Sequence, residues 1–251
     1  MAGWDDLDRE LDVWRDQGRT ATLWWRDDDA TRVTPALERL LAISGATGTP
    51  VALAVIPRDA DADLRDRLRR HPSAAVLQHG WSHENHAPDG CRQEEHGPHR
   101  PREVMLAELA EGWRRIGEFD CGLPVLVAPW NRIDEALLPA LPGIGLTGVS
   151  TLGPRDAGEP VAGLRRTNVH VDIVDWDGSR GFVGEEAALD QFVRHLARRR
   201  RGEADADEPT GMMTHHLFHD EGCWWFIGAL LARTARHPAV RWLDAGEAFW
   251  P

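Results

Sequence analysis

The sequence contains no lysine and no tyrosine, so all 29 of its basic side chains are arginines. Without lysine the chain has no Schiff-base nucleophile, which excludes pyridoxal-type covalent chemistry. The phosphate-binding lysine of a P-loop is missing for the same reason. Without tyrosine, no phenol is available as a general acid or base. These two absences remove several large classes of enzyme from consideration.

Cysteine is also scarce: Cys91, Cys121 and Cys223 are far apart, and no Cys-x-x-Cys pair occurs. An odd number of isolated cysteines indicates neither a disulfide framework nor a thiolate zinc site, and it favours a reducing compartment. The N-terminus lacks the basic start and apolar core of a signal peptide. No apolar run approaches membrane-spanning length. We therefore expect a cytoplasmic protein.

The charge balance restricts the partners. A formal net charge of −12 argues against nucleic acid, which favours a basic face, and against an anionic membrane surface. A length of 251 residues with 42% hydrophobic residues suffices for one large domain with a full core. We expect residues 1–251 to form a single domain.

Apolar strand patterns and helical patterns alternate about eight times along this chain. Such alternation favours a (β/α) barrel or a doubly wound sheet. No Gly-x-Gly-x-x-Gly follows the first strand, which weakens a dinucleotide-binding fold. We therefore predict an α/β fold, a distorted barrel of seven or eight strands. A helix within residues 1–18 should pack on it, another is expected near 134–141, and 85–101 is a candidate active-site loop.

Polar motifs follow five of the predicted strands. They are Asp27-Asp28-Asp29, His79, Trp130-Asn131, Asp175-Trp176 and His215-His216. In a (β/α) barrel the carboxyl ends of the strands share one rim, where active sites are built. The sequence therefore predicts that these side chains meet in one pocket.

His79 and His83 lie four positions apart, one at a strand end and one in the turn beyond it. If that turn is helical, both rings converge on one point. Two neutral imidazoles form half of a site for a divalent transition metal, and the Asp27–Asp29 triplet can supply the anionic ligand.

The order of these motifs resembles that of the polysaccharide deacetylase family, metal-dependent sugar deacetylases with a distorted (β/α) barrel. The family's opening Asp-Asp pair supplies a base and then a metal ligand. Asp28 and Asp29 match that pair, with Asp27 and Asp28 as the alternative register, and Thr34-Pro35 after them also resembles the family. His79 and His83 match its second motif, two histidines separated by three residues.

The remaining motifs match in part. The third keeps Pro129 and Trp130 but has Val127 where the family has an arginine that orients the catalytic aspartate; Arg26 or Arg132 is a candidate replacement. The fourth motif, an Asp followed by an Asp-Trp pair, corresponds to Asp172-Ile173-Val174-Asp175-Trp176. The fifth, an apolar strand ending in histidine, corresponds to Met212-Met213-Thr214-His215, with His216 adjacent.

The resemblance implies a metal-dependent hydrolase that removes an acetyl group from an N-acetylated amino sugar or a related carbohydrate. Zn²⁺ is the favoured ion, with Co²⁺, Ni²⁺ and Mn²⁺ as alternatives. The implied metal ligands are Asp29, His79 and His83. The implied catalytic groups are Asp28 or Asp27 as base, His215 or His216 as acid, and Asp175 orienting that acid. The implied substrate-binding residues are Pro129, Trp130, Asn131 and Trp176.

Two other functions fit the same residues. The valine at position 127 is compatible with a catalytically silent carbohydrate-binding relative. Two histidines and one carboxylate are also the ligands of Fe(II) oxygenases. Metal analysis and turnover measurements separate these possibilities.

Overall fold

The computed structural model describes residues 2–251 and is built around one parallel sheet. Its strands follow the order β6-β5-β4-β3-β2-β1-β8-β7, and β9 pairs with β1 outside that path. The strands are β1 Ala21–Ala30, β2 Val51–Val55, β3 Ala74–His79, β4 Gly122–Val127, β5 Gly148–Ser150, β6 Arg165–Arg166, β7 Val171–Asp172, β8 Thr210–Thr214 and β9 Val240–Trp242.

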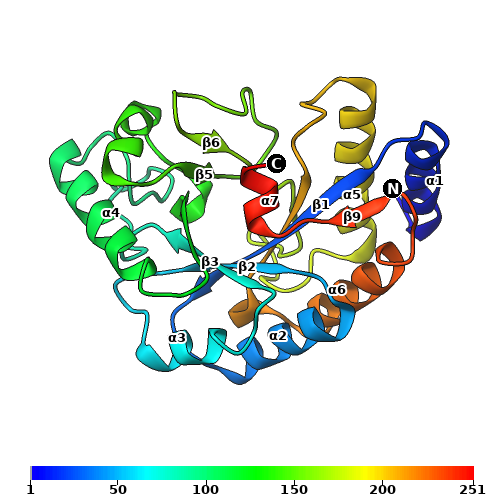
Figure 1. The fold of residues 1–251 in the computed structure, drawn as a ribbon, viewed down its shortest axis with the longest axis horizontal. Helices are drawn as coiled ribbons and strands as arrows, with labels where there is room; N and C mark the ends of the chain where they lie inside the picture. Colours follow the sequence, from blue (N-terminus) through cyan, green and yellow to red (C-terminus); the bar gives the residue numbers. More distant parts are fainter. Residues whose placement is uncertain (1) are drawn as a thin grey trace.

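The sheet curls into a distorted half-barrel, which confirms the predicted fold class. A parallel bridge between Leu152 and Val169 links the segment after β5 to the segment before β7. The helices surround the strands, with α4 on one side and α1, α5 and α6 on the other (Figure 1). They are α1 Trp4–Asp16, α2 Pro35–Thr47, α3 Ala62–Leu68, α4 Arg102–Ile116, α5 Glu185–Arg201, α6 Glu221–Thr234 and α7 Ala245–Phe249.

The strands separate two apolar layers. The inner layer includes Trp24, Ala52, Ala54 and Val127, and α7 adds Phe249 to it. The outer layer lies between the strands and the helices and includes Trp25 and Leu53, the sequence neighbours of inner residues. Because successive side chains on a strand point to opposite faces, one strand contributes to both layers. This alternation also decides which polar residues at the strand ends face the interior of the half-barrel.

Several helix ends have local causes visible in the sequence. Thr34 caps α2 by accepting a hydrogen bond from the backbone N–H of Leu37 at 3.0 Å, and Pro35 occupies the first helical position. Gly48 ends α2 in the left-handed conformation, with φ of 66°. Asp220 caps α6 in the same way as Thr34 caps α2.

One expectation for local structure was wrong, and one helix was not anticipated. The helix expected near 134–141 is a pair of short 3-10 segments, η2 Glu135–Ala140 and η3 Pro142–Ile144. Pro139 and Pro142 account for this, because proline lacks the N–H that an α-helix requires. The last helix, α7, was not expected; Asp244 and Glu247 form a capping box at its start.

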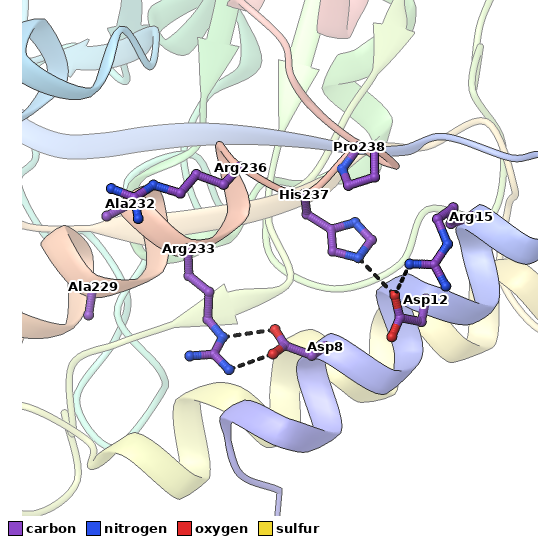
Figure 2. Close-up of a pocket in the computed structure, with 9 residues that line it drawn as sticks. All are labelled: Asp8, Asp12, Arg15, Ala229, Ala232, Arg233, Arg236, His237 and Pro238. Carbon is purple, nitrogen blue, oxygen red and sulfur yellow. Dashed lines mark hydrogen bonds and ion pairs between the residues drawn. The ribbon is translucent and has the colours of Figure 1, made fainter.

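Helix α1 lies against the end of α6, where opposite charges pair in a shallow groove (Figure 2). The guanidinium of Arg233 contacts Asp8, with Nε 2.8 Å from Oδ1, and His237 lies 3.3 Å from Asp12. None of the residues predicted for the active site lines this groove. Among residues 2–251, no helix combines the length and apolar character needed to cross a bilayer.

Candidate active site

Strand β1 carries the aspartate triplet and sorts it between the two faces of the sheet. Trp24 belongs to the inner apolar layer and Trp25 to the outer one. Alternation therefore directs Arg26 and Asp28 into the barrel and Asp27 toward the helices. Asp28 lines the central pocket, whereas Asp27 is fully buried and does not.

Asp29 breaks this alternation. Its φ of 73° lies in the left-handed region, and the pairing of β1 with β2 is irregular between Asp27 and Ala30. The carboxylate of Asp29 consequently lines the same pocket as that of Asp28, although the two residues are adjacent in the chain. A left-handed residue other than glycine costs conformational energy, and such strain is concentrated at functional sites.

His79 and His83 converge on Asp29. The Nε2 atoms of the two rings lie 3.2 Å and 3.4 Å from Oδ1 of Asp29. His79 closes β3, and His83 sits in the turn beyond it with φ of 57°. The predicted set of two imidazoles and one carboxylate is therefore brought together in space.

The protonation pattern of this cluster suits a divalent cation. Nδ1 of His79 lies 3.1 Å from the carbonyl oxygen of Val127, which can only accept, so the neutral ring presents a lone pair on Nε2 toward Asp29. Oδ1 of Asp29 is buried and has no hydrogen-bond partner of normal geometry among residues 2–251. Buried acceptors facing one another repel unless a cation lies between them. The three side chains fit a divalent metal ion.

The electrostatics of two of the three side chains, His83 and Asp29, agree with this fit. For His79, burial acts to lower the pKa, but the carboxylates of Asp29 and Asp28 outweigh it and raise the pKa above its ordinary value. Burial and the neighbouring His79 lower the pKa of His83 to about 4, so its ring is neutral at pH 7 and free to donate a lone pair. Burial alone would raise the pKa of Asp29, but the nearby imidazoles, His79 first, hold it below its usual value. Asp29 is thus anionic at neutral pH, as a carboxylate that could hold a metal ion must be.

Glu95, which the sequence did not single out, holds the turn that carries His83. Its buried carboxylate lies within 3.3 Å of the backbone nitrogens of Trp81, Ser82 and His83, and 3.0 Å from the Ser82 hydroxyl. A side chain at Gly80 would clash with this carboxylate, because an added Cβ would lie 2.0 Å from Oε2. A glutamate in a loop rich in histidine, proline and glycine carries no signal of this role.

Arg26 occupies the interior of the barrel beside Asp28. Its Nε and Nη2 atoms lie 2.8 Å and 2.9 Å from the two carboxylate oxygens of Asp28. Nη1 donates to the hydroxyl of Ser150, and Nη2 also lies 2.8 Å from Oδ1 of Asn131. Both partners of the ion pair are buried. Of the two arginines considered as replacements at the third motif, Arg26 contacts the aspartate, whereas Arg132 donates to the carbonyl of Gln93.

His215 faces the pocket from the end of β8. Its Nε2 lies 4.0 Å from Oδ2 of Asp28, and its ring packs edge-on against Trp176 with centroids 4.7 Å apart. The indole N–H of Trp176 donates to Asp172 at 2.9 Å. Burial raises the pKa of Asp172, although the nearby His215 opposes that shift.

Other residues named from the sequence lie outside the pocket. Asp175 accepts hydrogen bonds from the backbone N–H and hydroxyl of Ser179, so it orders a turn. Asp172, not Asp175, lines the pocket together with His215. His216 points to the outer face and pairs with Asp27. Pro129 packs behind Gly80 and does not line the pocket.

The pocket itself has a volume of about 710 Å³. It has aromatic walls from Trp130, Trp176 and Phe218 and two arginines, Arg132 and Arg180. The remaining lining residues are Asp28, Asp29, His79, His83, Gln93, Asn131, Leu152, Asp172, Asp177, Met213 and His215. A cleft with flat aromatic sides and a few convergent polar groups suits a small polar ligand such as a sugar.

A second cluster, His170, His195 and Glu208, is buried elsewhere and also groups potential ligand atoms. The backbone N–H of Gly211 donates to Nδ1 of His170 at 3.0 Å, so the neutral ring carries its proton on Nε2, which faces Glu208 at 3.2 Å. Burial lowers the pKa of His170, which keeps that ring neutral. This cluster is a close contact between a neutral histidine and Glu208, and it offers no free lone pair on His170.

No sequence-family profile matches this chain. No curated protein matches it either. The solved structures, by contrast, give broad matches.

The fold is that of the polysaccharide deacetylases, also called family 4 carbohydrate esterases. A putative polysaccharide deacetylase from Mycobacterium smegmatis matches with a TM-score of 0.60 and 15% identity over 92% of this chain and 90% of that one. A family 4 acetyl xylan esterase from Clostridium thermocellum, solved with a cobalt ion, matches with a TM-score of 0.51 and 14% identity over 91% and 90%. A variant of a family 4 pseudoenzyme with restored activity matches with a TM-score of 0.61 and 10% identity over 92% and 68%.

Proposed function

We propose that this protein is a metal-dependent hydrolase that removes an acetyl group from an N-acetylated amino sugar or a related carbohydrate. The observation that carries the proposal is the convergence of Asp29, His79 and His83 beside Asp28 and His215 in one pocket. A metal triad, a second carboxylate and an imidazole are the groups that hydrolysis of an acyl bond needs. The fold shared with polysaccharide deacetylases supports the proposal.

Asp29, His79 and His83 would hold the ion and leave its remaining positions open to the pocket. Zn²⁺ is the ion we favour for a set of two imidazoles and one carboxylate, with Co²⁺ as an alternative suggested by the cobalt-bound esterase. A divalent ion there supplies a water of lowered pKa and polarises the acyl oxygen.

Asp28 is the proposed general base. It lies in the pocket next to Asp29, and its negative charge is held in place by the two-point contact with Arg26. Fixing a carboxylate in this way keeps it aligned with the proton that it must accept. The asparagine Asn131 and the hydroxyl of Ser150 in turn fix the guanidinium.

His215 is the proposed general acid. It faces the pocket 4.0 Å from Asp28, and Asp172 lines the same pocket. As the acyl C–N bond breaks, its electron pair stays with nitrogen, and His215 supplies the proton that makes the departing group a neutral amine. We propose Asp172, in place of Asp175, as the carboxylate that orients this acid.

The pocket walls are the proposed substrate contacts. The indoles of Trp130 and Trp176 offer flat faces to a sugar ring, and Asn131 offers an amide. Trp130 has φ of 52° and packs against His83 with ring centroids 4.2 Å apart, which sets it beside the metal triad. Its backbone N–H is the proposed donor to the oxyanion.

Acetate release from a panel of N-acetylated and O-acetylated sugars, combined with metal analysis of the same preparation, tests the proposal. We expect about one divalent ion per chain and turnover that Asp28→Asn reduces by at least about 10²-fold. Equal turnover by wild type and Asp28→Asn would contradict it.

The competing function is a catalytically silent sugar binder, which the valine at position 127 favours. In that case the metal-loaded protein binds acetylated sugars without turnover. The ion pair between Arg26 and Asp28 argues for an active enzyme, because it restores the contact that the valine removes. Iron in the purified protein, with oxygen consumption, would point to the oxygenase instead.

A further inference from the structure

Asp27 differs from the other two aspartates of the triplet because it faces away from the pocket. Its side chain is fully buried on the outer face of β1, where apolar residues predominate. A carboxylate buried in such surroundings is costly unless donors surround it. Asp27 is adjacent to Asp28, the proposed base, but it has no access to the pocket. It must therefore have a different role from Asp28 and Asp29.

The donors around Asp27 come from the two residues that flank His215. Oδ2 accepts the hydroxyl hydrogen of Thr214 at 2.6 Å and the backbone N–H of His216 at 3.0 Å. Oδ1 is the partner of Nδ1 of His216. One carboxylate therefore ties down the residue before His215 and the residue after it.

We propose that Asp27, together with His216, is a positioning residue that fixes His215 for proton transfer. This inference rests on the proposed function of His215 as the acid. Strand alternation explains the arrangement: Thr214 and His216 share the outer face with Asp27, and His215 between them faces the pocket with Asp28. His215 and Asp28 thus form an inner layer that faces the substrate. His216 and Asp27 form an outer layer that supports it.

The supporting layer is itself held firmly. Thr214 is the direct partner of Asp27 in the pairing of β1 with β8, and its hydroxyl also accepts the indole N–H of Trp25 at 2.9 Å. Beyond it, β8 ends and the short turn η4 His216–Phe218 begins. The contacts of His216 with Asp27 are the polar link between this turn and the rigid strand β1. Without them, this polar anchor of the strand end carrying His215 is lost.

Loss of this support should affect substrates according to their leaving groups. Release of an amine from an N-acetylated sugar requires a proton from His215, whereas 4-nitrophenolate leaves without one. A displaced acid therefore slows the amide reaction and spares 4-nitrophenyl acetate. A displacement of about 1 Å is enough to cost on the order of 10²-fold in rate.

The test compares Asp27→Asn and His216→Gln with His215→Ala and Asp28→Asn on both substrates. We expect the two supporting variants to lower kcat for the N-acetylated sugar by about 10- to 100-fold, with KM and metal content unchanged. Activity on 4-nitrophenyl acetate should stay within about threefold of wild type, the pattern also expected of His215→Ala. Asp28→Asn should lose both activities. If Asp27→Asn does not fold, His216→Gln alone tests the positioning role, because this variant keeps the buried Asp27 carboxylate.

Equal losses on both substrates, or no loss on either, would overturn the positioning role while leaving the hydrolase itself intact. A second measurement is independent of turnover. The His215 ring signal, identified by its disappearance in His215→Ala, should broaden or shift in NMR spectra of His216→Gln, because the ring lies against the Trp176 indole. An unchanged signal overturns the inference even if no substrate is found, whereas absence of any acetate release from wild type counts only against the proposed function.

Discussion

Arg26 and Asp28 form a two-point ion pair inside the barrel, with nitrogen–oxygen distances of 2.8 Å and 2.9 Å. The two residues lie on the same face of β1 because they are two positions apart. The resemblance places the orienting arginine in the third motif, at the position of Val127, the last residue of β4. In this chain the guanidinium that contacts Asp28 comes from β1 itself, three strands away from β4 in the order of the sheet.

Replacing Arg26 by glutamine should remove most of the activity and part of the stability. Breaking a buried pair from one side typically costs about 3–5 kcal/mol, because it leaves the other charge unpaired. We expect kcat to fall by about 10²-fold or more, since Asp28 loses its alignment. Assays of acetate release measure the change in kcat, and urea denaturation measures the change in the free energy of unfolding. Arg132→Gln is the matched control, because Arg132 also lines the pocket. A larger loss of kcat in Arg132→Gln than in Arg26→Gln would assign the orienting role to Arg132.

Removing either imidazole of the metal triad should remove the ion. His79→Ala and His83→Ala each leave one nitrogen and one carboxylate, too few for a stable site with open positions. We expect metal content by mass spectrometry and acetate release to fall together to background. His86→Ala, in the neighbouring loop and outside the pocket, should retain both. Retained metal in His79→Ala would show that the ion binds elsewhere.

Glu95→Gln should weaken metal binding without touching a ligand. The carboxylate gathers the backbone nitrogens of the Trp81–His83 turn, and an amide cannot accept from all of them. Supporting groups of this kind typically change metal affinity by about 10- to 100-fold. Competition with a chromophoric chelator measures the change. Glu94→Gln, one residue earlier, is the control, and equal affinities of the two variants would rule out the supporting role.

His96 should make the protein less stable in acid. Burial, reinforced by Arg100, lowers the pKa of this histidine to about 3, and neither ring nitrogen has a described partner. Between pH 6.5 and that value the unfolded chain binds a proton that the folded chain does not, so the free energy of unfolding falls as the pH falls. At pH 5 the loss is about 2 kcal/mol, from 1.36 kcal/mol per unit.

The variant His96→Leu isolates this contribution. Relative to wild type, its free energy of unfolding should depend less on pH between 7 and 5, measured by urea denaturation at each pH. Parallel curves for the two proteins over that range would show that His96 is protonated in the folded state.

Much of this site could be found from the chain alone because each motif follows an apolar strand. The ends of parallel strands meet at one rim, so His79, Trp130 and His215 were expected near the Asp triplet, and they line one pocket. Strand alternation, counted from the apolar pairs Trp24/Trp25 and Met212/Met213, would also have separated Asp28 from Asp27 and His215 from His216. Alternation alone does not say which member of each pair faces the pocket, because that depends on which apolar neighbour lies in the inner layer.

The sequence by itself determined the barrel, the paired imidazoles and the absence of lysine chemistry, since these follow from periodicity, spacing and composition. Only the tertiary structure decided that Asp29 turns into the pocket, because its left-handed φ of 73° interrupts the alternation that governs the rest of β1. It alone joined Glu95 to the His83 turn and Asp27 to the residues around His215, contacts between segments 12 to 189 positions apart. Such contacts depend on how separate strands and loops pack, and local sequence pattern does not encode that packing.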